Sequence, residues 1–162
     1  MHSIRYASPQ DIPLIRELTF KVWPQTYSAI ISKEQVDFML EMMYSESSLQ
    51  QQMNDGSRFI IVYDDEIAAG FASFQHTGNG IYKLHKIYIL ASRQGKGTGR
   101  YAIDFIINEI KPEGGTALRL QVNRNNKAKD FYTKMGFEVI EEADFDIGNG
   151  FYMNDYVMQK KI

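Results

Sequence analysis

Residues 93–100 read Arg93-Gln94-Gly95-Lys96-Gly97-Thr98-Gly99-Arg100, and this stretch decides the fold. It follows a strand-like run, Lys83 to Leu90, and leads directly into an apolar helical segment, Tyr101 to Ile110. Its three glycines have no Cβ atom, so successive backbone N–H groups can approach an anion at the positive end of a helix. The stretch therefore predicts a phosphate-binding turn between a strand and a helix.

Two common phosphate-binding patterns do not fit this turn. A Walker A loop requires G-x-x-x-x-G-K-[ST], but here Lys96 precedes Gly97-Thr98 and no glycine stands at the required earlier position. A dinucleotide fingerprint, G-x-G-x-x-G, needs a third glycine where this chain has Arg100. The spacing that remains is Gln94-x-x-Gly97-x-Gly99.

Length and composition limit the classes of function. A chain of 162 residues with 44% hydrophobic residues is the size of one domain, which we expect to span residues 1–162. The formal net charge of −2 gives no general attraction for nucleic acid or an anionic membrane. The absence of cysteine excludes disulfides, thiolate nucleophiles and zinc–thiolate sites. With no apolar run long enough for a signal peptide or a membrane span, we expect a cytoplasmic protein without a metal.

Hydrophobic periodicity predicts the order of the elements. We expect a strand at 3–7, a helix from 9 to 23, helices at 33–44 and 45–54, strands at 58–63, 67–76 and 81–90, a helix at 101–110, a strand at 116–122, a helix ending at 135, and strands at 136–140 and 151–160. Trp23-Pro24 should end the first helix, and residues 143–150 should form a polar hairpin loop. The order β-αα(α)-βββ-α-β-α-ββ predicts one α+β domain with a mixed, mostly antiparallel seven-stranded sheet flanked by helices.

A second motif follows the glycine turn: Asn125-x-x-Ala128-x-x-Phe131-Tyr132-x-Lys134-x-Gly136-Phe137. Together with Gln94-x-x-Gly97-x-Gly99 after the fourth predicted strand, it resembles the two hallmark motifs of the GNAT superfamily of N-acyltransferases. The resemblance extends over essentially the whole chain. It implies the GNAT fold and the transfer of an acetyl group from acetyl-CoA to an amine.

The resemblance also implies which residues hold coenzyme A. The backbone of the fourth strand would bind the pantetheine arm across a gap beside the fifth strand, and the glycine turn would bind the pyrophosphate. Basic side chains nearby would contact the phosphates. The residues implied are Ile87, Tyr88, Ile89, Gln94, Gly95, Lys96, Gly97, Thr98, Gly99, Arg100, Asn125, Lys129, Tyr132 and Lys134.

The catalytic roles implied are a general acid and a general base. Tyr132 would lie near the thioester sulfur, and a phenol of pKa about 10 is protonated at neutral pH. Many relatives have a glutamate base on the fourth or fifth strand, but this chain has His85 there, beside Lys83. His85 alternates onto the face of Ile87 and Ile89, and its neutral imidazole could accept the amine proton; a structural role is the alternative. No covalent intermediate is required, so we expect direct attack in a ternary complex.

The acceptor should bind between the region after the first helix and the last hairpin. Both regions are rich in aromatic and acidic side chains, which can hold an amine by cation–π contact and ion pairing. The candidate acceptor-binding residues are Trp23, Tyr27, Glu41 and Tyr152. Three segments also resemble the bacterial spermidine/spermine acetyltransferase-like branch: Trp23-Pro24-Gln25-Thr26-Tyr27, the strand Lys86-Ile87-Tyr88-Ile89 and the closing Phe151-Tyr152-Met153-Asn154-Asp155-Tyr156. That resemblance implies a polyamine or another small amine as the acceptor.

A function of another class stays open. A GNAT-fold module could bind acyl-CoA without catalysis, as a sensor or partner-binding domain. The intact glycine turn and Tyr132 favour an enzyme. The partners implied are a small-molecule or peptide amine, not nucleic acid or a membrane, and a homodimer is compatible with the resemblance.

Overall fold

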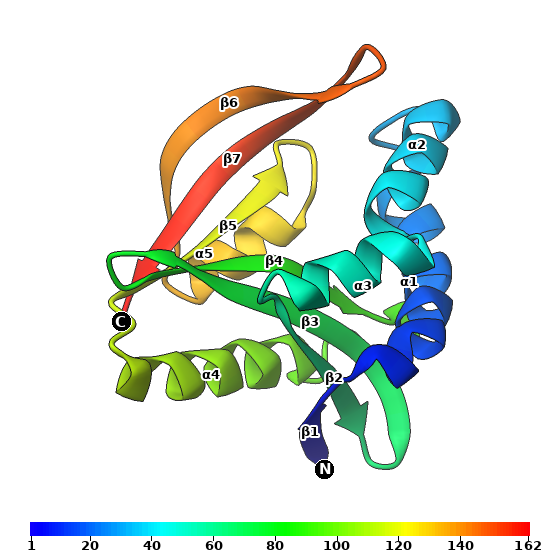
Figure 1. The fold of residues 1–162 in the computed structure, drawn as a ribbon. Helices are drawn as coiled ribbons and strands as arrows, with labels where there is room; N and C mark the ends of the chain where they lie inside the picture. Colours follow the sequence, from blue (N-terminus) through cyan, green and yellow to red (C-terminus); the bar gives the residue numbers. More distant parts are fainter.

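The sheet has seven strands in the order β1-β2-β3-β4-β5-β7-β6, and only the β4–β5 pair is parallel (Figure 1). The computed structural model describes residues 1–162. The strands are β1 (His2–Tyr6), β2 (Arg58–Asp64), β3 (Ile67–Gly78), β4 (Ile81–Ile89), β5 (Ala117–Asn123), β6 (Glu138–Gly148) and β7 (Phe151–Lys161). The helices are α1 (Ile12–Tyr27), α2 (Lys33–Tyr44), α3 (Glu46–Asn54), α4 (Thr98–Ile110) and α5 (Ala128–Lys134). The predicted α+β fold class is confirmed.

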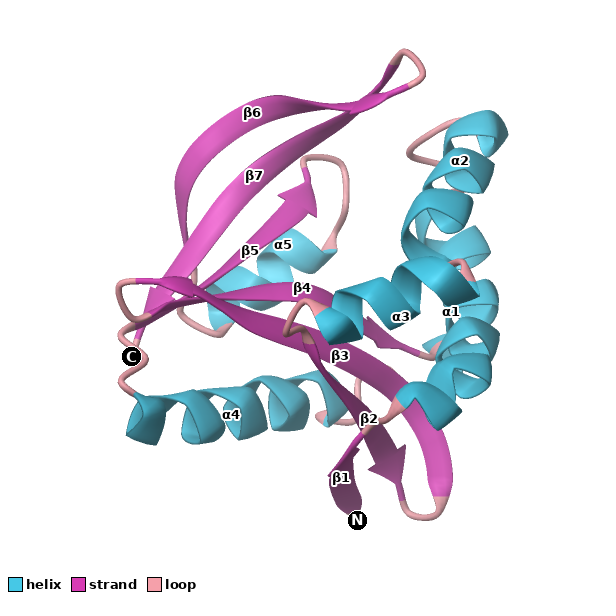
Figure 2. Cartoon of the chain, in the orientation of Figure 1, coloured by secondary structure: helices cyan, strands magenta, loops and turns pink.

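Helices cover both faces of the sheet, and each face has its own core (Figure 2). On one face α4 packs with fully buried Ile103 and Ile106 against β-strand residues that include Leu118. On the other face α1, α2 and α3 enclose a second core that includes Ile15 and Leu49. The centre of the sheet is therefore buried on both faces.

The strands β4 and β5 pair only over their first halves. The parallel register runs from Ile81 with Ala117 to Leu84 with Leu120 and then stops. Beyond that point β4 continues along β3, and β5 continues along β7. The second halves of β4 and β5 diverge, as Figure 2 shows, and leave a gap in the centre of the sheet.

A β-bulge at His85 reverses the alternation of side chains along β4. The strand pairs with β3 through Leu84 and then through Lys86, so His85 is the extra residue. Ile87 packs on the α4 side. His85 instead lines a cavity on the opposite side of the sheet together with Lys86. The prediction that His85 shares a face with Ile87 and Ile89 is therefore wrong.

Helix α1 continues one turn past its predicted end and contains Pro24. Proline has no N–H, so the carbonyl of Phe20 loses its helical donor. The cost is limited because Pro24 lies in the last turn, where its own carbonyl accepts from Ser28 N–H at 3.3 Å. The neighbouring Trp23 is only 1% exposed. The prediction that the helix ends at Trp23-Pro24 is wrong because burial of this indole holds the last turn in the helical conformation.

The last hairpin has longer strands and a shorter loop than predicted. Residues 143–148 belong to β6, which pairs with β7 as far as Gly148 with Phe151. Only Asn149 and Gly150 form the turn, with φ of 55° and 77°, as in a type I′ hairpin. The predicted loop at 143–150 is wrong because β6 is the edge of the sheet, and an edge strand tolerates the acidic side chains that suggested a loop.

We expect Pro24→Ala to stabilise the protein by about 1–3 kcal/mol, because alanine restores the N–H that the Phe20 carbonyl lacks. Pro24 is exposed, so no core packing is lost. Chemical denaturation followed by circular dichroism measures the free energy of unfolding. Gln25→Ala, at the next exposed position, is the control and should change it little. Lower stability of Pro24→Ala would contradict this account of α1.

Candidate active site

The glycine turn has the backbone geometry that only glycine adopts readily. Gly95 and Gly97 have φ of 77° and 81°. Gly99 lies so close to α5 that a Cβ there would be 3.2 Å from Cζ of Phe131. The first two glycines therefore shape the turn, and the third allows α4 and α5 to touch.

The turn presents unpaired backbone donors. The N–H groups of residues 95–100 have no hydrogen-bond partner in the chain, and the first bond of α4 runs from Tyr101 N–H to the Gly97 carbonyl at 2.9 Å. They lie at the N-terminus of a 13-residue helix, whose dipole adds positive charge. The side chains of Lys96 and Arg100 are exposed beside them. This arrangement fits a pyrophosphate.

Two polar side chains of the turn hold its shape. The Thr98 hydroxyl is buried and lies 2.9 Å from Nε2 of His2. The side-chain amide of Gln94 donates to the Ile89 carbonyl at 3.0 Å, which ties the turn to the end of β4. Thr98 and Gln94, both predicted to bind coenzyme A, are thus placed to support the turn.

The end of β4 offers backbone groups to the gap. Leu90 N–H donates to the Ala69 carbonyl of β3 at 2.8 Å. Because the direction of hydrogen bonding alternates along an antiparallel strand, the backbone of Tyr88 also faces β3. The N–H and C=O groups of Ile87 and the N–H group of Ile89 then face the gap, while the Ile89 carbonyl accepts from Gln94. Ile87 and Ile89 can therefore pair with an amide-containing arm through their backbone. The side chain of Tyr88 lines the cavity instead.

The remaining predicted coenzyme A residues lie on or before α5. Asn125 is exposed, and its N–H donates to Oδ1 of Asn123 at 2.9 Å. The Lys129 ammonium lies 5.3 Å from the centroid of the Tyr156 ring. Lys134 is exposed at the end of α5. Their side chains are thus spread along α5, on the side of the gap opposite β4.

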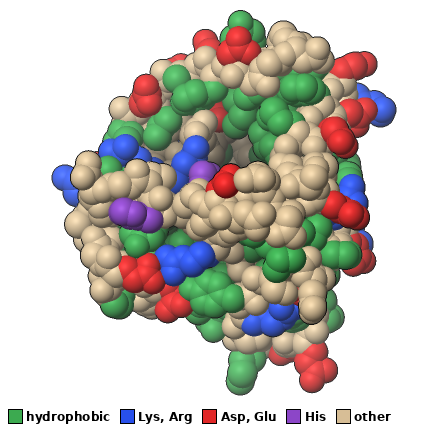
Figure 3. Space-filling view, in the orientation of Figure 1, with side chains coloured by type: hydrophobic (Ala, Val, Ile, Leu, Met, Phe, Trp, Pro, Cys, Tyr) green, Lys and Arg blue, Asp and Glu red, His purple; other side chains and the backbone are tan.

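A cavity of about 480 Å³ lies on the other side of the gap, lined by residues of the strands β3 to β7 and of the helices α1 to α3. Figure 3 shows the hollow, bordered by hydrophobic side chains and by basic, histidine and acidic groups. The predicted acceptor residues Trp23 and Tyr27 line it. Glu41 is exposed on α2 and Tyr152 is 48% exposed, and neither lines the cavity.

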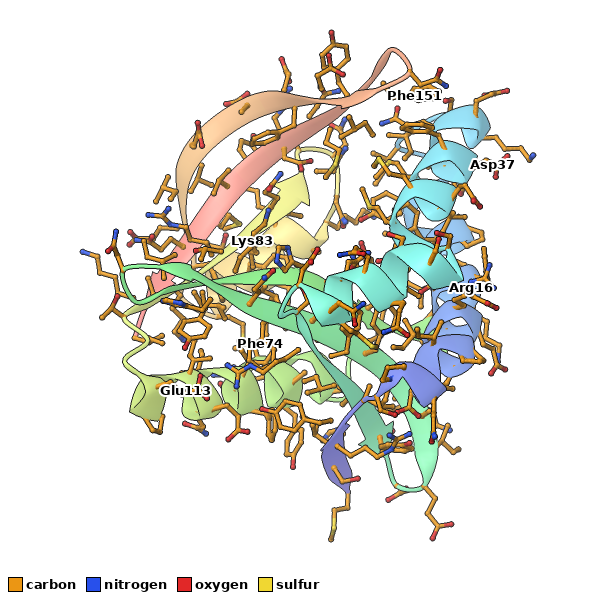
Figure 4. All side chains as sticks on the ribbon, in the orientation of Figure 1. Arg16, Asp37, Phe74, Lys83, Glu113 and Phe151 are labelled. Carbon is orange, nitrogen blue, oxygen red and sulfur yellow. The ribbon has the colours of Figure 1, made fainter.

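The tip of the last hairpin closes the cavity against α2. Phe151 lies beside α2 in Figure 4, and its ring centroid is 5.4 Å from that of Phe38. The side-chain amide of Gln35 donates to the Tyr152 carbonyl at 2.7 Å. Tyr152 therefore contributes to this region through its backbone, and the cavity is bounded by elements far apart in the sequence.

Tyrosine hydroxyls gather at the inner end of the cavity. The hydroxyls of Tyr27 and Tyr88 are 3.1 Å apart, and the Tyr27 ring lies 4.5 Å from that of Trp23. Burial raises the pKa of Tyr27, Tyr88, Tyr44 and Tyr132, each with a smaller contribution from neighbouring tyrosines. All four phenols are therefore protonated at neutral pH.

Charged side chains occupy the walls of the cavity. The Lys86 side chain is buried, with its ammonium 4.8 Å from the centroid of the Tyr44 ring. Burial, with the charge of Lys83, lowers the pKa of Lys86 to about 8. Lys83 donates to Oε1 of Gln121 at 2.6 Å, and Gln121 donates to Oδ2 of Asp155 at 3.2 Å. Burial raises the pKa of the Asp155 carboxyl, which is 2% exposed.

His85 lies at the rim of the same cavity. Its Nε2 is 3.1 Å from Oε1 of Gln75, and the side chain is exposed. Desolvation at the cavity wall, with the positive charges of Lys83 and Lys86, lowers the pKa of His85 to about 4. The imidazole is neutral at pH 7 and weakly basic.

The family model described as "Acetyltransferase (GNAT) domain" matches residues 27–159. The chain belongs to this family. It is an acetyltransferase whose acyl donor is acetyl-CoA.

Curated GNAT relatives span nearly the same length. An uncharacterized N-acetyltransferase of Mycobacterium bovis is 23% identical over 155 residues, which cover 94% of this chain and 98% of the relative. An uncharacterized N-acetyltransferase of Bacillus subtilis is 26% identical over 154 residues, covering 91% of this chain and 86% of the relative. The PaiA N-acetyltransferase of Thermoplasma acidophilum, solved with coenzyme A, has a TM-score of 0.83 at 24% identity, covering 100% and 99% of the two chains. The PaiA structure and this chain share the same fold.

Lys86 and Asp155 line the cavity but are not among the candidate catalytic or binding residues that the sequence predicts. Asp155 belongs to the last hairpin, whose acidic side chains are predicted to hold an amine. The sequence pattern predicts regular alternation along the strand that contains Lys86, and the bulge at His85 has no clear sequence signature. Asp155 faces the cavity because β7 pairs with β5, opposite Asn123. The only indication in the sequence is that each of these two charged residues stands in a strand rich in apolar residues, where charged side chains are uncommon.

The described residues contain no group of three or more metal-ligating side chains suited to a metal ion. None of the helices has both the length and the apolar character needed to cross a bilayer.

We expect acetyl-CoA to raise the melting temperature of the enzyme, and Gly95→Ala to weaken that effect by reducing affinity about tenfold or more. Alanine at φ of 77° is strained by about 1–2 kcal/mol and redirects the N–H groups of the turn. Gly114→Ala is a matched control, because Gly114 has φ of 90° and, like Gly95, open space around a built Cβ.

Both variants should lose stability, but only Gly95→Ala should lose affinity for acetyl-CoA in a titration calorimetry experiment. Equal affinities of Gly95→Ala and the wild type would show that the turn does not bind the donor.

Proposed function

We propose that this GNAT enzyme transfers the acetyl group of acetyl-CoA to the primary amine of a small molecule by direct attack in a ternary complex. One observation carries the proposal: the gap between β4 and β5 has an anion-binding turn at one side and a cavity of about 480 Å³ at the other. Donor and acceptor can therefore enter from opposite sides and meet between the two strands.

The chain's own groups fit the donor in three places. The N–H groups of residues 95–100 would hold the pyrophosphate, with Lys96 and Arg100 beside it. The backbone groups of Ile87 and Ile89 would pair with the pantetheine amides, as an added strand does. Asn125, on the α5 side of the gap, would hold that arm from across the gap.

The reaction makes defined demands on the protein. Acetyl-CoA supplies an acetyl thioester; the amine nitrogen forms a bond to the acetyl carbon while the carbon–sulfur bond breaks. The amine loses one proton and the departing sulfur gains one. An N–H of Ile87 or Ile89 that faces the gap is placed to donate to the developing oxyanion.

Tyr132 is our candidate for the general acid. It is 8% exposed and lies on α5, and its raised pKa keeps the hydroxyl protonated. The α5 helix touches the glycine turn through Phe131 and Gly99, so Tyr132 lies close to where the donor would be held. A hydroxyl there can donate its proton to the leaving sulfur.

Asp155 is better suited than His85 to accept the amine proton. Its carboxylate is inside the cavity, and its charge helps to raise the pKa of Tyr27, whose hydroxyl contacts Tyr88. The raised pKa of Asp155 makes it a stronger base than an ordinary aspartate, whereas His85 has a pKa of about 4 and pairs with Gln75 at the rim.

The polyamine acceptor stays a prediction. Asp155 and the aromatic rings of Trp23 and Tyr27 support a cationic amine in the cavity. Lys83 and Lys86 on the same wall count against an acceptor with several ammonium groups. The acceptor class that the cavity supports best is a small molecule with one reacting amine.

We expect Tyr132→Phe to lower kcat about 100-fold with little change in the affinity for acetyl-CoA, since only the proton donor is removed. Release of coenzyme A can be followed with a thiol-reactive dye, because the chain has no cysteine to react with it. Tyr101→Phe, at a 40% exposed tyrosine of α4, is the control. Unchanged kcat in Tyr132→Phe would exclude this role, and a wild type that binds acetyl-CoA but acetylates no amine would favour the sensor alternative.

We expect Asp155→Asn to lower kcat about 100-fold and to raise the melting temperature at neutral pH. The folded-state pKa of Asp155 is above its unfolded value, so the ionised carboxylate destabilises the fold above that raised pKa. This cost is absent below the unfolded pKa of about 4, where the melting temperatures should converge. Asp37→Asn, at an exposed carboxylate on α2, should change neither property. A lower melting temperature with full activity would refute both claims.

A further inference from the structure

Lys83 and Lys86 place two ammonium groups on the β4 wall of the cavity without a carboxylate partner. No Asp or Glu oxygen lies within 4.0 Å of either nitrogen, and Lys83 has only the neutral amide of Gln121. Figure 4 shows Lys83 near the centre of the molecule, beside β5. Solvation by bulk water does not explain how the buried ammonium of Lys86 is stabilised.

Lys86 is the more unusual of the two. Its side chain is 9% exposed, yet it donates no hydrogen bond to the protein and has only the Tyr44 ring as a neighbour for its charge. Asp155 compensates the charge of Lys83 but not that of Lys86, whose pKa is lowered by burial and by Lys83 without any opposing effect. A buried charge that the protein leaves uncompensated is available for a ligand.

A purely structural role accounts less well for Lys86. The side chain packs on Tyr44, and a methionine would fill that space without the desolvation cost of an ammonium. The Lys86 side chain also lines a cavity enclosed by residues of several helices and strands, instead of extending to bulk water. The charge itself therefore requires an explanation.

The same cavity also has a buried negative group. Asp155 lies on β7 opposite Asn123, at the end of β5 where the gap opens, and Gln121 links its carboxylate to Lys83. Other wall residues are apolar, among them Met39, Ile147 and Met153. A guest that matches this lining carries an amine and a carboxylate close together, with an apolar group against the apolar walls.

We propose that the acceptor is an amino carboxylate with an apolar side chain, whose carboxylate binds Lys86 and Lys83 while its amine lies toward Asp155. This inference rests on the proposed acetyl transfer and names its substrate class. A polyamine would place further ammonium groups against the lysines, which repel them. A carboxylate supplies the negative charge that Lys86 lacks.

Chain-matched amines test the inference. L-phenylalanine is compared with 2-phenylethylamine, and L-methionine with 3-(methylthio)propylamine, with spermidine as a third class of acceptor. We expect the wild type to favour each carboxylate-bearing member by about 10- to 100-fold in kcat/KM, because an ion-paired hydrogen bond is absent from its partner. Lys86→Met should remove most of that preference by raising KM for the amino acid. The plain amine and acetyl-CoA should keep their KM values.

The controls separate charge from folding. Lys111→Met makes the same change at an exposed lysine outside the cavity and should leave every KM unchanged. Lys86→Gln keeps a polar end but no charge, and should behave like Lys86→Met. Both cavity variants should melt no lower than the wild type, because a buried charge is removed.

Equal kcat/KM within each pair, a preference for spermidine, or an equal loss for both members in Lys86→Met would overturn the inference and leave acetyl transfer standing. If no amine is acetylated although acetyl-CoA binds, the proposed function fails. Melting temperatures with each amine then decide the inference separately. Greater stabilisation of the wild type by the carboxylate member, lost in Lys86→Met, supports it, and no such difference overturns it.

Discussion

The incomplete pairing of β4 with β5 is the constraint on which the rest of the structure depends. A buried backbone N–H or C=O without a partner costs free energy, so a sheet seldom opens at its centre. Here the parallel ladder stops at Leu84 and Leu120, and each strand finds its next partner on the other side. The gap leaves the backbone groups of Ile87 and the N–H of Ile89 without a strand partner. In the proposed function, a donor that pairs with these groups would also complete the sheet.

The two helical layers give the gap different surroundings on the two faces of the sheet. On one side α4 begins with a turn of unpaired N–H groups, and the contact of Gly99 with Phe131 brings α5 to it. On the other side α1–α3 and the tip of the last hairpin enclose an aromatic cavity. The bulge at His85 connects these functions, because it rotates Lys86 into the cavity while the following residues keep their pairing with β3. A strand without this bulge would not place both His85 and Lys86 on the cavity side.

The sequence motifs were sufficient for the element order and the glycine turn, because glycine and helix-start chemistry act over a few residues. Gly95 and Gly97 have the positive φ that the turn requires. Local rules failed where distant contacts decide. Burial of Trp23 carried α1 through Pro24, and pairing with β7 made a strand of the acidic segment 143–148. Trp23 and Tyr27 line the cavity, whereas Glu41 does not. The face of a helix and the partner of a strand decide where a side chain lies, and a short sequence motif specifies neither.

Stability and function oppose each other in the cavity. Lys86 and Asp155 are both buried, and burial moves the pKa of each toward its neutral form, lower for the lysine and higher for the aspartate. Apolar or neutral replacements would remove these desolvation costs, so packing alone would not favour the charged pair. Gln121 links Asp155 to Lys83, whereas Lys86 has no such link. Both buried charges carry a desolvation cost in the free cavity, and a guest of matching polarity would offset part of that cost.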